Sequence, residues 1–205
     1  MNRLMTGFKT RLPAVAFLAG ALIMSATCGD TVTQSRSSSY LVIESLMAAS
    51  GAQTGTFNNT LASDVVTSGT VFEDIGQVNL RIAMKDPGTT DSPTSPSPTN
   101  EITVNRYRVV YTRSDGRNTQ GIDVPYAFDG ATTGTVTASG TSMTFVLVRV
   151  QAKLEAPLKA LAGGGSSVVI STIAQVTFYG RDQAGNDTSV TGTISVNFAD
   201  WSDSQ

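Results

Sequence analysis

The chain has 205 residues, and 40% of them are apolar, which is enough for one sizeable hydrophobic core and argues for a single domain. Charged residues make up 15% and aromatic residues 7%, and Gly, Ser and Thr are abundant, so the composition favours short strands and turns over helix bundles. With no His, one Cys and a net charge of −2, the sequence excludes Ser-His-Asp and Cys-His catalytic arrangements and His-ligated metal sites.

The chain opens with a cationic and then apolar segment. Three cations precede an apolar stretch over residues 12–27, which ends directly before Cys28, the single cysteine. This stretch has 16 residues, fewer than the roughly 20 that a helix needs to span a bilayer, so the pattern indicates an export signal. It resembles a bacterial lipoprotein signal, and that resemblance implies that residues 1–27 are removed and that Cys28 is acylated.

Two further expectations follow from this resemblance. Gly29, rather than Asp, follows Cys28, which implies transport to the outer membrane of a Gram-negative bacterium. The alternative for Cys28 is a free thiol in an exported domain that is cleaved at another position. Residues 28–39 are small, polar and without periodicity, so they are expected to form a flexible tether behind the lipidated cysteine.

Removal of the signal changes the charge balance. Residues 1–27 hold three of the 14 cationic residues and none of the 16 acidic ones, which leaves the mature chain at about −5. Because binding to phosphates requires positive surface, this balance argues against nucleic acid as a partner. We therefore expect attachment to the lipid bilayer through acylated Cys28 rather than through a basic face.

Alternating apolar and polar residues predict a domain of successive strands over residues 40–201, followed by a tail at 202–205. The clearest strand patterns lie at 77–85, 102–113, 141–151, 168–182 and 189–198, and shorter candidates lie at 40–47, 61–67, 121–128 and 134–139. Residues 145–148 are apolar on both faces, which places their strand in the centre of a sheet. Eight or nine strands with polar turns favour a two-sheet sandwich with Greek-key connections.

A Pro/Ser/Thr-rich segment at residues 86–100 interrupts the strand series and holds four of the seven prolines. Proline lacks an N–H donor, so the segment is expected to be a disordered or extended hairpin loop. The alternative is a protruding recognition loop or a glycosylated one.

One short helical turn is expected near residues 154–162. Leu154, Leu158 and Leu161 recur at helical spacing, and Gly163 is suited to a left-handed helix end. Pro157 limits how far the turn extends upstream unless it lies in the first turn. We expect this segment to cover one open end of the sandwich.

The last two predicted strands flank a turn that reads Asp182, Gln183, Ala184, Gly185, Asn186. This hairpin resembles the closing hairpin of bacterial immunoglobulin-like repeat domains, in which a D-x-A-G-N turn joins two alternating strands. The resemblance covers about 23 residues and implies an immunoglobulin-like sandwich, with adhesion, carbohydrate binding or domain spacing as the common roles. The mature chain also resembles uncharacterised single-domain bacterial lipoproteins.

Arginines and tyrosines alternate around residues 106–117. Arg106, Arg108, Arg113 and Arg117 are candidate contacts for an acidic glycan, because cations and aromatic rings bind such ligands together. The structural alternative is that the arginines lie along a sheet while the tyrosines pack beneath it, since strand alternation places Arg106 and Arg108 opposite the tyrosines.

Two acidic turns are candidates for calcium. Asp182, Asn186 and Asp187 fall in one predicted hairpin turn. The same types of residue occur in a second loop, at Asp115, Asn118 and Asp123. Neither spacing matches an EF-hand, and Asn and Asp also favour turns for their local hydrogen bonds, so no metal and no cofactor is assigned.

Two functional hypotheses remain. The favoured one is a non-catalytic module of the cell envelope that binds a protein or glycan or has a structural role. The second is a carbohydrate-binding or carbohydrate-active module, which coplanar exposed aromatic residues on one sheet face would favour. Catalysis is disfavoured, because no P-loop, dinucleotide motif or S-x-x-K dyad is present and nothing singles out two of the glutamates Glu44, Glu73, Glu101 and Glu155 as a glycosidase pair.

Overall fold

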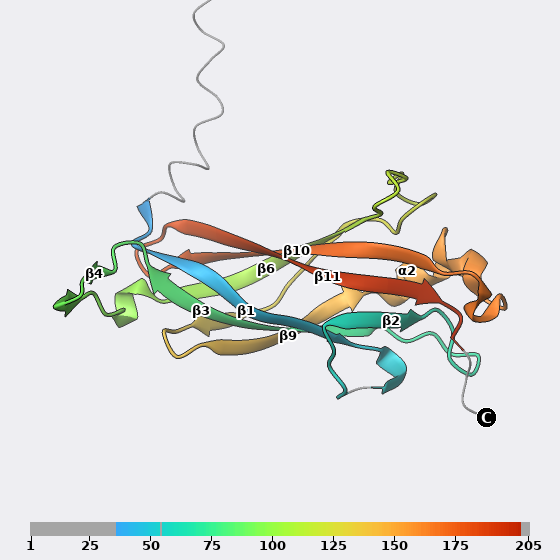
Figure 1. Cartoon of the computed structure of the whole chain (residues 1–205), viewed down its shortest axis with the longest axis horizontal. Helices are drawn as coiled ribbons and strands as arrows, with labels where there is room; N and C mark the ends of the chain where they lie inside the picture. Colours follow the sequence, from blue (N-terminus) through green and yellow to red (C-terminus); the bar gives the residue numbers. More distant parts are fainter. Residues whose placement is uncertain (1–35, 54, 202–205) are drawn as a thin grey trace, which may run out of the picture.

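The computed structural model describes residues 36–53 and 55–201 and is an all-β protein in which two sheets pack face to face (Figure 1). The smaller sheet has the strand order β1-β3-β9 and is antiparallel throughout. Its strands are β1 (Ser39–Ala49), β3 (Asp74–Met84) and β9 (Thr141–Val148). The predicted signal, Cys28, most of the expected tether and the tail at 202–205 lie outside the described residues.

The larger sheet has the order β2-β11-β10-β6-β7, and β8 also pairs with β6. The long strand β10 pairs antiparallel with β6 on one side and with β11 on the other, whereas β2 runs parallel to β11 at the edge. Its strands are β2 (Thr60–Asp64), β6 (Ile102–Thr112), β7 (Phe128–Gly130), β8 (Gly134–Val136), β10 (Ile170–Asp182) and β11 (Asp187–Ala199).

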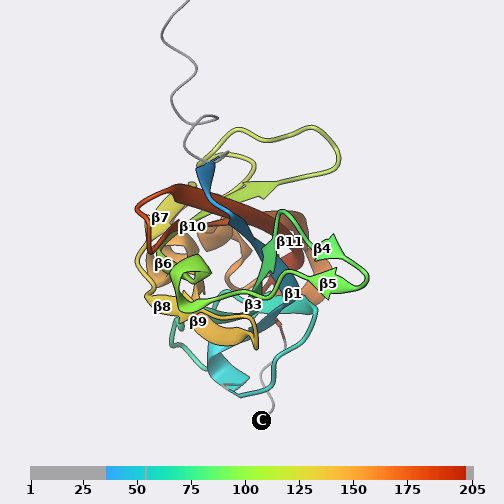
Figure 2. The same ribbon diagram turned by 90° about the vertical axis from the view of Figure 1, so that its left-hand side faces the viewer.

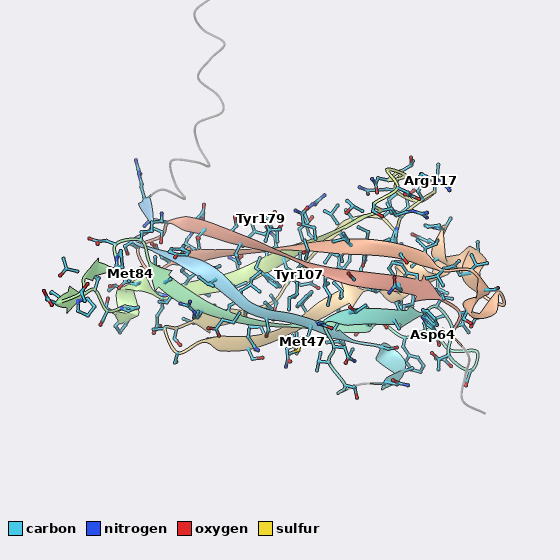
Figure 3. All side chains as sticks on the ribbon, viewed as in Figure 1. Met47, Asp64, Met84, Tyr107, Arg117 and Tyr179 are labelled. Atoms are coloured by element: carbon cyan, nitrogen blue, oxygen red, sulfur yellow. The ribbon has the colours of Figure 1, made fainter. Side chains whose placement is uncertain are left out.

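Aromatic side chains join the two sheets at the centre of the core. The ring of Phe145 in β9 lies 5.1 Å from that of Tyr107 in β6 and 5.2 Å from that of Phe178 in β10. Figure 3 shows Tyr107 between the two layers and Tyr179 on the outer surface, as strand alternation requires. Inward residues of every long strand continue this core, so the two sheets form one hydrophobic unit.

The sandwich is elongated and its two ends differ (Figures 1 and 2). The Arg36 end carries the start of β1, the 86–100 segment and the β10–β11 turn. The opposite end, called the helical end below, carries the 65–73 connection, the 113–127 loop, and the segment from Val150 to Val169 that includes the short helices. Within residues 37–53 and 55–201 the helical segments are α2 (Val150–Leu154) and the 3-10 turns η1 (Gly51–Gln53), η2 (Pro98–Asn100), η3 (Leu158–Leu161) and η4 (Gly165–Ser167).

Most of the strand predictions are confirmed. In β3 the side chains of Val78, Leu80 and Ile82 are buried, and in β6 those of Tyr107, Val109 and Tyr111 are buried, while the residues between them are more exposed. The expected inward sets of the last hairpin are also correct: Ala174, Val176, Phe178, Ile194, Val196 and Phe198 are buried, and Val190 packs against the core.

Two strand predictions are wrong. The strand predicted at 141–151 is an edge strand rather than a central one, because β9 pairs only with β3 among the strands. Side chains cover its other edge: Thr132 Oγ1 donates to the carbonyl of Thr144, and the backbone amide of Val146 donates to Tyr107 Oη. Residues 121–128 form a loop up to β7, because tight turns around Gly121 replace an extended ladder.

The 86–100 segment is an ordered hairpin that extends beyond the sandwich (Figure 2). It contains its own two-stranded ribbon, β4 (Gly88–Thr89) with β5 (Ser92–Pro93), and ends in η2. Asn100 fixes the return of this hairpin to the sheet. The side-chain amide of Asn100 donates to Ser38 Oγ, and its backbone carbonyl accepts from Ser39 Oγ at 2.6 Å. The hairpin form of the prediction is therefore correct, and the disordered form is not.

The helical turn expected at 154–162 is present in two pieces. Leu158 and Leu161 of η3 are buried, and Gly163 has the positive φ of 79° that a left-handed end requires. Leu154 is exposed, contrary to the helical spacing, because α2 ends at this residue and Pro157 separates it from η3. The segment covers the open end of the sandwich, as expected.

Candidate functional site

Arg106 and Arg108 lie on the outer face of the six-stranded sheet and share one acidic partner. Arg106 Nη1 lies 3.2 Å and Arg108 Nη1 2.6 Å from the carboxylate of Asp129 in β7. The guanidinium of Arg106 also covers the ring of Tyr179 at 4.1 Å. Both arginines are solvent-exposed, but their charges and the ring face already have partners within the chain.

Arg113 and Arg117 lie apart from this cluster, in the 113–127 loop at the helical end (Figure 3). Arg113 pairs with Asp115 at 2.6 Å, and Arg117 pairs with Asp123 at 2.9 Å. Hydrogen bonding to Asp115 raises the pKa of Arg113, and the same bond lowers the pKa of Asp115. The four candidate arginines therefore form two separate groups rather than one continuous strip.

The candidate calcium residues of the closing hairpin are engaged in local hydrogen bonds. Asp182 Oδ1 accepts from the amides of Ala184 and Asn186, and the side-chain amide of Asn186 donates to both carboxylate oxygens. Asp187 pairs instead with Arg181 at 2.7 Å. Partial burial acts to raise the pKa of Asp182, but these hydrogen bonds outweigh it and leave the pKa below its ordinary value.

The second candidate calcium loop shows a similar arrangement. Asp123 accepts from the amide of Thr119 and pairs with Arg117, while Asn118 Oδ1 accepts from the amide of Arg113. These bonds hold the loop against itself, which is the usual role of Asp and Asn in turns. Within the described ranges, no group of three or more Cys, Asp or Glu side chains is arranged to hold a metal ion.

An open pocket of about 420 Å³ lies at the Arg36 end, between the 86–100 hairpin and the outer face of the smaller sheet. Tyr40, Met84, Pro87 and Pro96 supply apolar lining. Arg81 lies at its side and pairs with Glu44 at 2.9 Å. Tyr40 is thus the one exposed aromatic side chain that borders this pocket.

A buried ion pair lies at the helical end. Lys153 Nζ of α2 is 2.9 Å from Asp74 Oδ1 of β3, and the two side chains are 1% and 0% exposed. Asp74 also accepts from the amide of Gly51 at 2.9 Å and from Ser63 Oγ at 2.6 Å. Burial raises the pKa of Asp74 above its ordinary value, although Lys153 and these donors act to lower it.

Exposed apolar side chains concentrate at the same end. Of the eight large apolar residues that are exposed in the described part of the chain, seven lie on the connections and strand starts of the helical end, and Tyr40 is the exception. The seven are Phe72, Ile122, Tyr126, Leu154, Val168, Val169 and Ile173. Ile122 is 69% and Leu154 52% exposed, the two highest values of the seven together with Val168 at 52%.

A shallow pocket of about 140 Å³ adjoins this apolar end on the outer face of the larger sheet. Ser114 of the 113–127 loop forms one side, and Ile173, Ser195 and Asn197 form its floor. The pocket is small and open, so it is suited to receive a side chain of a partner rather than to enclose a small molecule.

Sequence reasoning missed both features of the helical end. Asp74 and Lys153 are 79 positions apart and neither lies in a motif, so no local signal relates them. The exposed apolar side chains of the helical end could be predicted in part, because Val168 and Val169 come before the alternating part of the strand pattern at 168–182.

Comparison with protein-family models, with curated proteins and with solved structures finds no match for this chain. Among the residues described, no helix has the length and apolar character needed to cross a membrane.

Proposed function

We propose that this chain is an exported lipoprotein, anchored through acylated Cys28, whose β-sandwich is a non-catalytic binding module that contacts an envelope protein through its helical end. The observation that carries the proposal is the concentration of exposed apolar side chains at the end opposite Arg36. Exposed apolar side chains that gather at one place on a surface are a feature of protein interaction sites.

The position of the anchor supports this arrangement. Cys28 precedes Arg36 by eight residues, which reach at most about 28 Å when fully extended. The 13-residue strand β10 alone extends about 43 Å along the sandwich. A lipid at Cys28 therefore holds the Arg36 end near the bilayer and leaves the helical end free to meet a partner.

The outer membrane of a Gram-negative bacterium is the proposed location, on the evidence of Gly29 after Cys28. The immunoglobulin-like identity of the sandwich is likewise a proposal, supported by the D-x-A-G-N turn of its closing hairpin. In that turn Gly185 has a φ of 87°, which explains the need for glycine at this position.

A protein partner is favoured over a glycan. Sugar-binding faces use exposed aromatic rings in one plane, but the exposed rings of Tyr40, Phe72 and Tyr126 lie on three separate connections and strand ends. Tyr179, on the broad outer face, is covered by the guanidinium of Arg106. The absence of His and the engagement of the acidic turns in local bonds favour a non-catalytic role over an enzyme.

Site-specific photo-crosslinking in intact cells tests this proposal. A photoreactive amino acid is placed at Ile122 or Leu154, and at Tyr40 as the matched exposed control on the other end. We expect one protein adduct of the same mass from the two helical-end positions and none from Tyr40. Equal adducts from all three positions, or none from Ile122 and Leu154, would contradict the proposal.

A further inference from the structure

The ion pair of Asp74 and Lys153 is removed from water on all sides. Lys153 reaches Asp74 from α2, across the open end of the sandwich, and neither side chain has measurable contact with solvent. Transfer of two charges into such a site carries a desolvation cost, which works against their mutual attraction. A reaction that removes both charges is therefore favoured by the dry surroundings of the pair.

The surroundings also polarise the carboxyl group. The amide of Gly51 donates to Oδ1, and the hydroxyl of Ser63 donates to Oδ2. Hydrogen-bond donors on both oxygens draw electrons from Cγ and stabilise the negative charge that appears on oxygen when a nucleophile adds to it. The amine of Lys153 is the nucleophile within reach, at 2.9 Å from Oδ1.

The elements that carry the pair are held in place by the core. Asp74 begins β3, which is the central strand of its sheet, and Ser63 lies in β2 of the other sheet. Lys153 follows Ala152, which packs into the hydrophobic core. Reacting groups held together in this way have the entropic advantage of an intramolecular reaction.

We propose that Lys153 and Asp74 condense within the folded domain to form an intramolecular amide bond. A proton first moves from Nζ to Oδ1 across their 2.9 Å hydrogen bond, which leaves a neutral amine and a neutral carboxyl group. Nζ then forms a bond to Cγ, the bond from Cγ to Oδ1 breaks, and Oδ1 leaves as water with the proton that Nζ loses. Oδ2 becomes the amide carbonyl oxygen and keeps its hydrogen bond from Ser63, so the step needs no other reactant.

Such a bond supplies a cross-link that this chain has no other means to form. Exported domains are commonly stabilised by disulfides, and a chain with one cysteine has no intramolecular disulfide. The amide joins the helical segment at Lys153 to the first residue of β3 and thereby fixes the apolar end of the sandwich. This inference is independent of the lipid on Cys28 and of any partner.

Peptide mapping by mass spectrometry tests the cross-link on the mature protein purified from membranes. Trypsin acting on the denatured, uncondensed chain releases two separate peptides, Ser37–Arg81 and Val150–Lys153. The condensed chain instead gives a branched peptide, in which Ser37–Arg81 is joined to Val150–Lys159 with the loss of one water, because the modified Lys153 resists cleavage. We expect the branched peptide, with fragment ions that place the bond at Asp74 and Lys153.

Two variants complete the test. The branched peptide must disappear in Lys153→Met, which has no amine. In Lys159→Met, where an exposed lysine of the neighbouring turn is removed, the branch must persist, and its second arm then runs from Val150 to Arg181 because the tryptic site at position 159 is lost. Recovery of the two separate peptides from the wild-type protein, without the branched one, would overturn the proposal. Since the wild-type digest decides the outcome, a folding defect in Lys153→Met does not affect it.

Discussion

Gly76 of β3 lies directly opposite Phe145 of β9, and the aromatic ring of Phe145 fills the space that a Cβ at position 76 would need. A Cβ built on Gly76 would lie 2.3 Å from the Cζ atom of that ring. The same ring contacts Tyr107 and Phe178 of the other sheet, so it cannot move without disturbing the centre of the core. The absence of a side chain at Gly76 thus allows the two sheets to pack closely.

The substitution Gly76→Ala is expected to lower the free energy of unfolding by about 2 kcal/mol, because overpacking of a closed core forces shifts in side chains and backbone. Urea denaturation monitored by circular dichroism measures this loss. Gly134→Ala is the matched control: its Cβ would meet the sulfur of Met143, the end region of a flexible side chain, so a clearly smaller loss is expected. Equal losses in the two variants would contradict the role given to Phe145.

Tyr111 connects the two sheets by a buried hydrogen bond from its hydroxyl to the carbonyl of Leu147, at 2.5 Å. Tyr111→Phe is expected to destabilise the domain by about 1 to 3 kcal/mol, since the buried carbonyl loses its donor. Tyr40→Phe, at an exposed tyrosine, is expected to change stability by less than about 0.5 kcal/mol. Thermal or urea unfolding of both variants provides the comparison.

The pH dependence of Tyr111 follows from its burial, which raises the pKa of the phenol above its ordinary value of 10.0. Because the folded-state pKa is the higher one, the stabilising contribution is fully present below pH 10 and is lost as the pH rises above that value. Ultraviolet titration should therefore detect the ionisation of Tyr111 only with alkaline unfolding. An absorbance change near pH 10 in the folded protein that Tyr111→Phe removes would contradict the buried environment.

Asp182 has the opposite pH dependence, because its hydrogen bonds from Ala184 and Asn186 leave its pKa below the ordinary 3.8 despite partial burial. The folded-state pKa is the lower one, so the contribution of Asp182 is present above about pH 4 and is lost as the pH falls through the folded-state pKa. NMR titration of the side-chain carboxyl measures this value. In Asp182→Ala we expect a loss of about 1 kcal/mol or more, with the loss greatest near neutral pH.

The sequence was sufficient to predict which side chains lie in the core where one face of a strand is buried and the other is exposed to solvent. In β3 this contrast imposes strict alternation, and in β6 the alternation holds from Arg106 to Thr112, so residues such as Leu80 and Tyr107 could be placed in the core from their spacing. The turn at Gly185 was readable for a similar local reason, because a positive φ requires glycine.

The sequence was insufficient to predict the position of a strand or the partner of a side chain where distant parts of the chain bury them. In β9, Val148 is buried beside the helical end although the strand lies at a sheet edge. The apolar character of Val148 therefore indicated a central strand, which β9 is not. The partner of Lys153 could not be predicted, since the chain crosses from β3 to the larger sheet and back to β9 between Asp74 and Lys153. The separation of Arg106 from Arg117 depends likewise on the course of the 113–127 loop.

Lipidation of Cys28 is expected to determine the membrane association of the chain. Cells fed an alkyne-bearing fatty acid should label the wild-type protein and should not label Cys28→Ala. The same substitution should move the protein from the membrane fraction to the soluble exported fraction, since a multiply acylated cysteine is a firm anchor and the mature chain, at about −5, has no excess of positive charge. A Cys28→Ala protein that stays labelled and membrane-bound would contradict the proposed anchor.

The most direct test of the proposed function is co-purification of partner proteins with the wild-type chain and with the double variant Ile122→Asp, Leu154→Asp. Both residues are exposed, so the double variant should unfold at nearly the same urea concentration as the wild type. Tyr40→Asp, at the Arg36 end, is the matched control. We predict that a protein retained by the wild type and by Tyr40→Asp is lost from the double variant, whereas the same proteins retained in equal amounts by all three would contradict a binding site at the helical end.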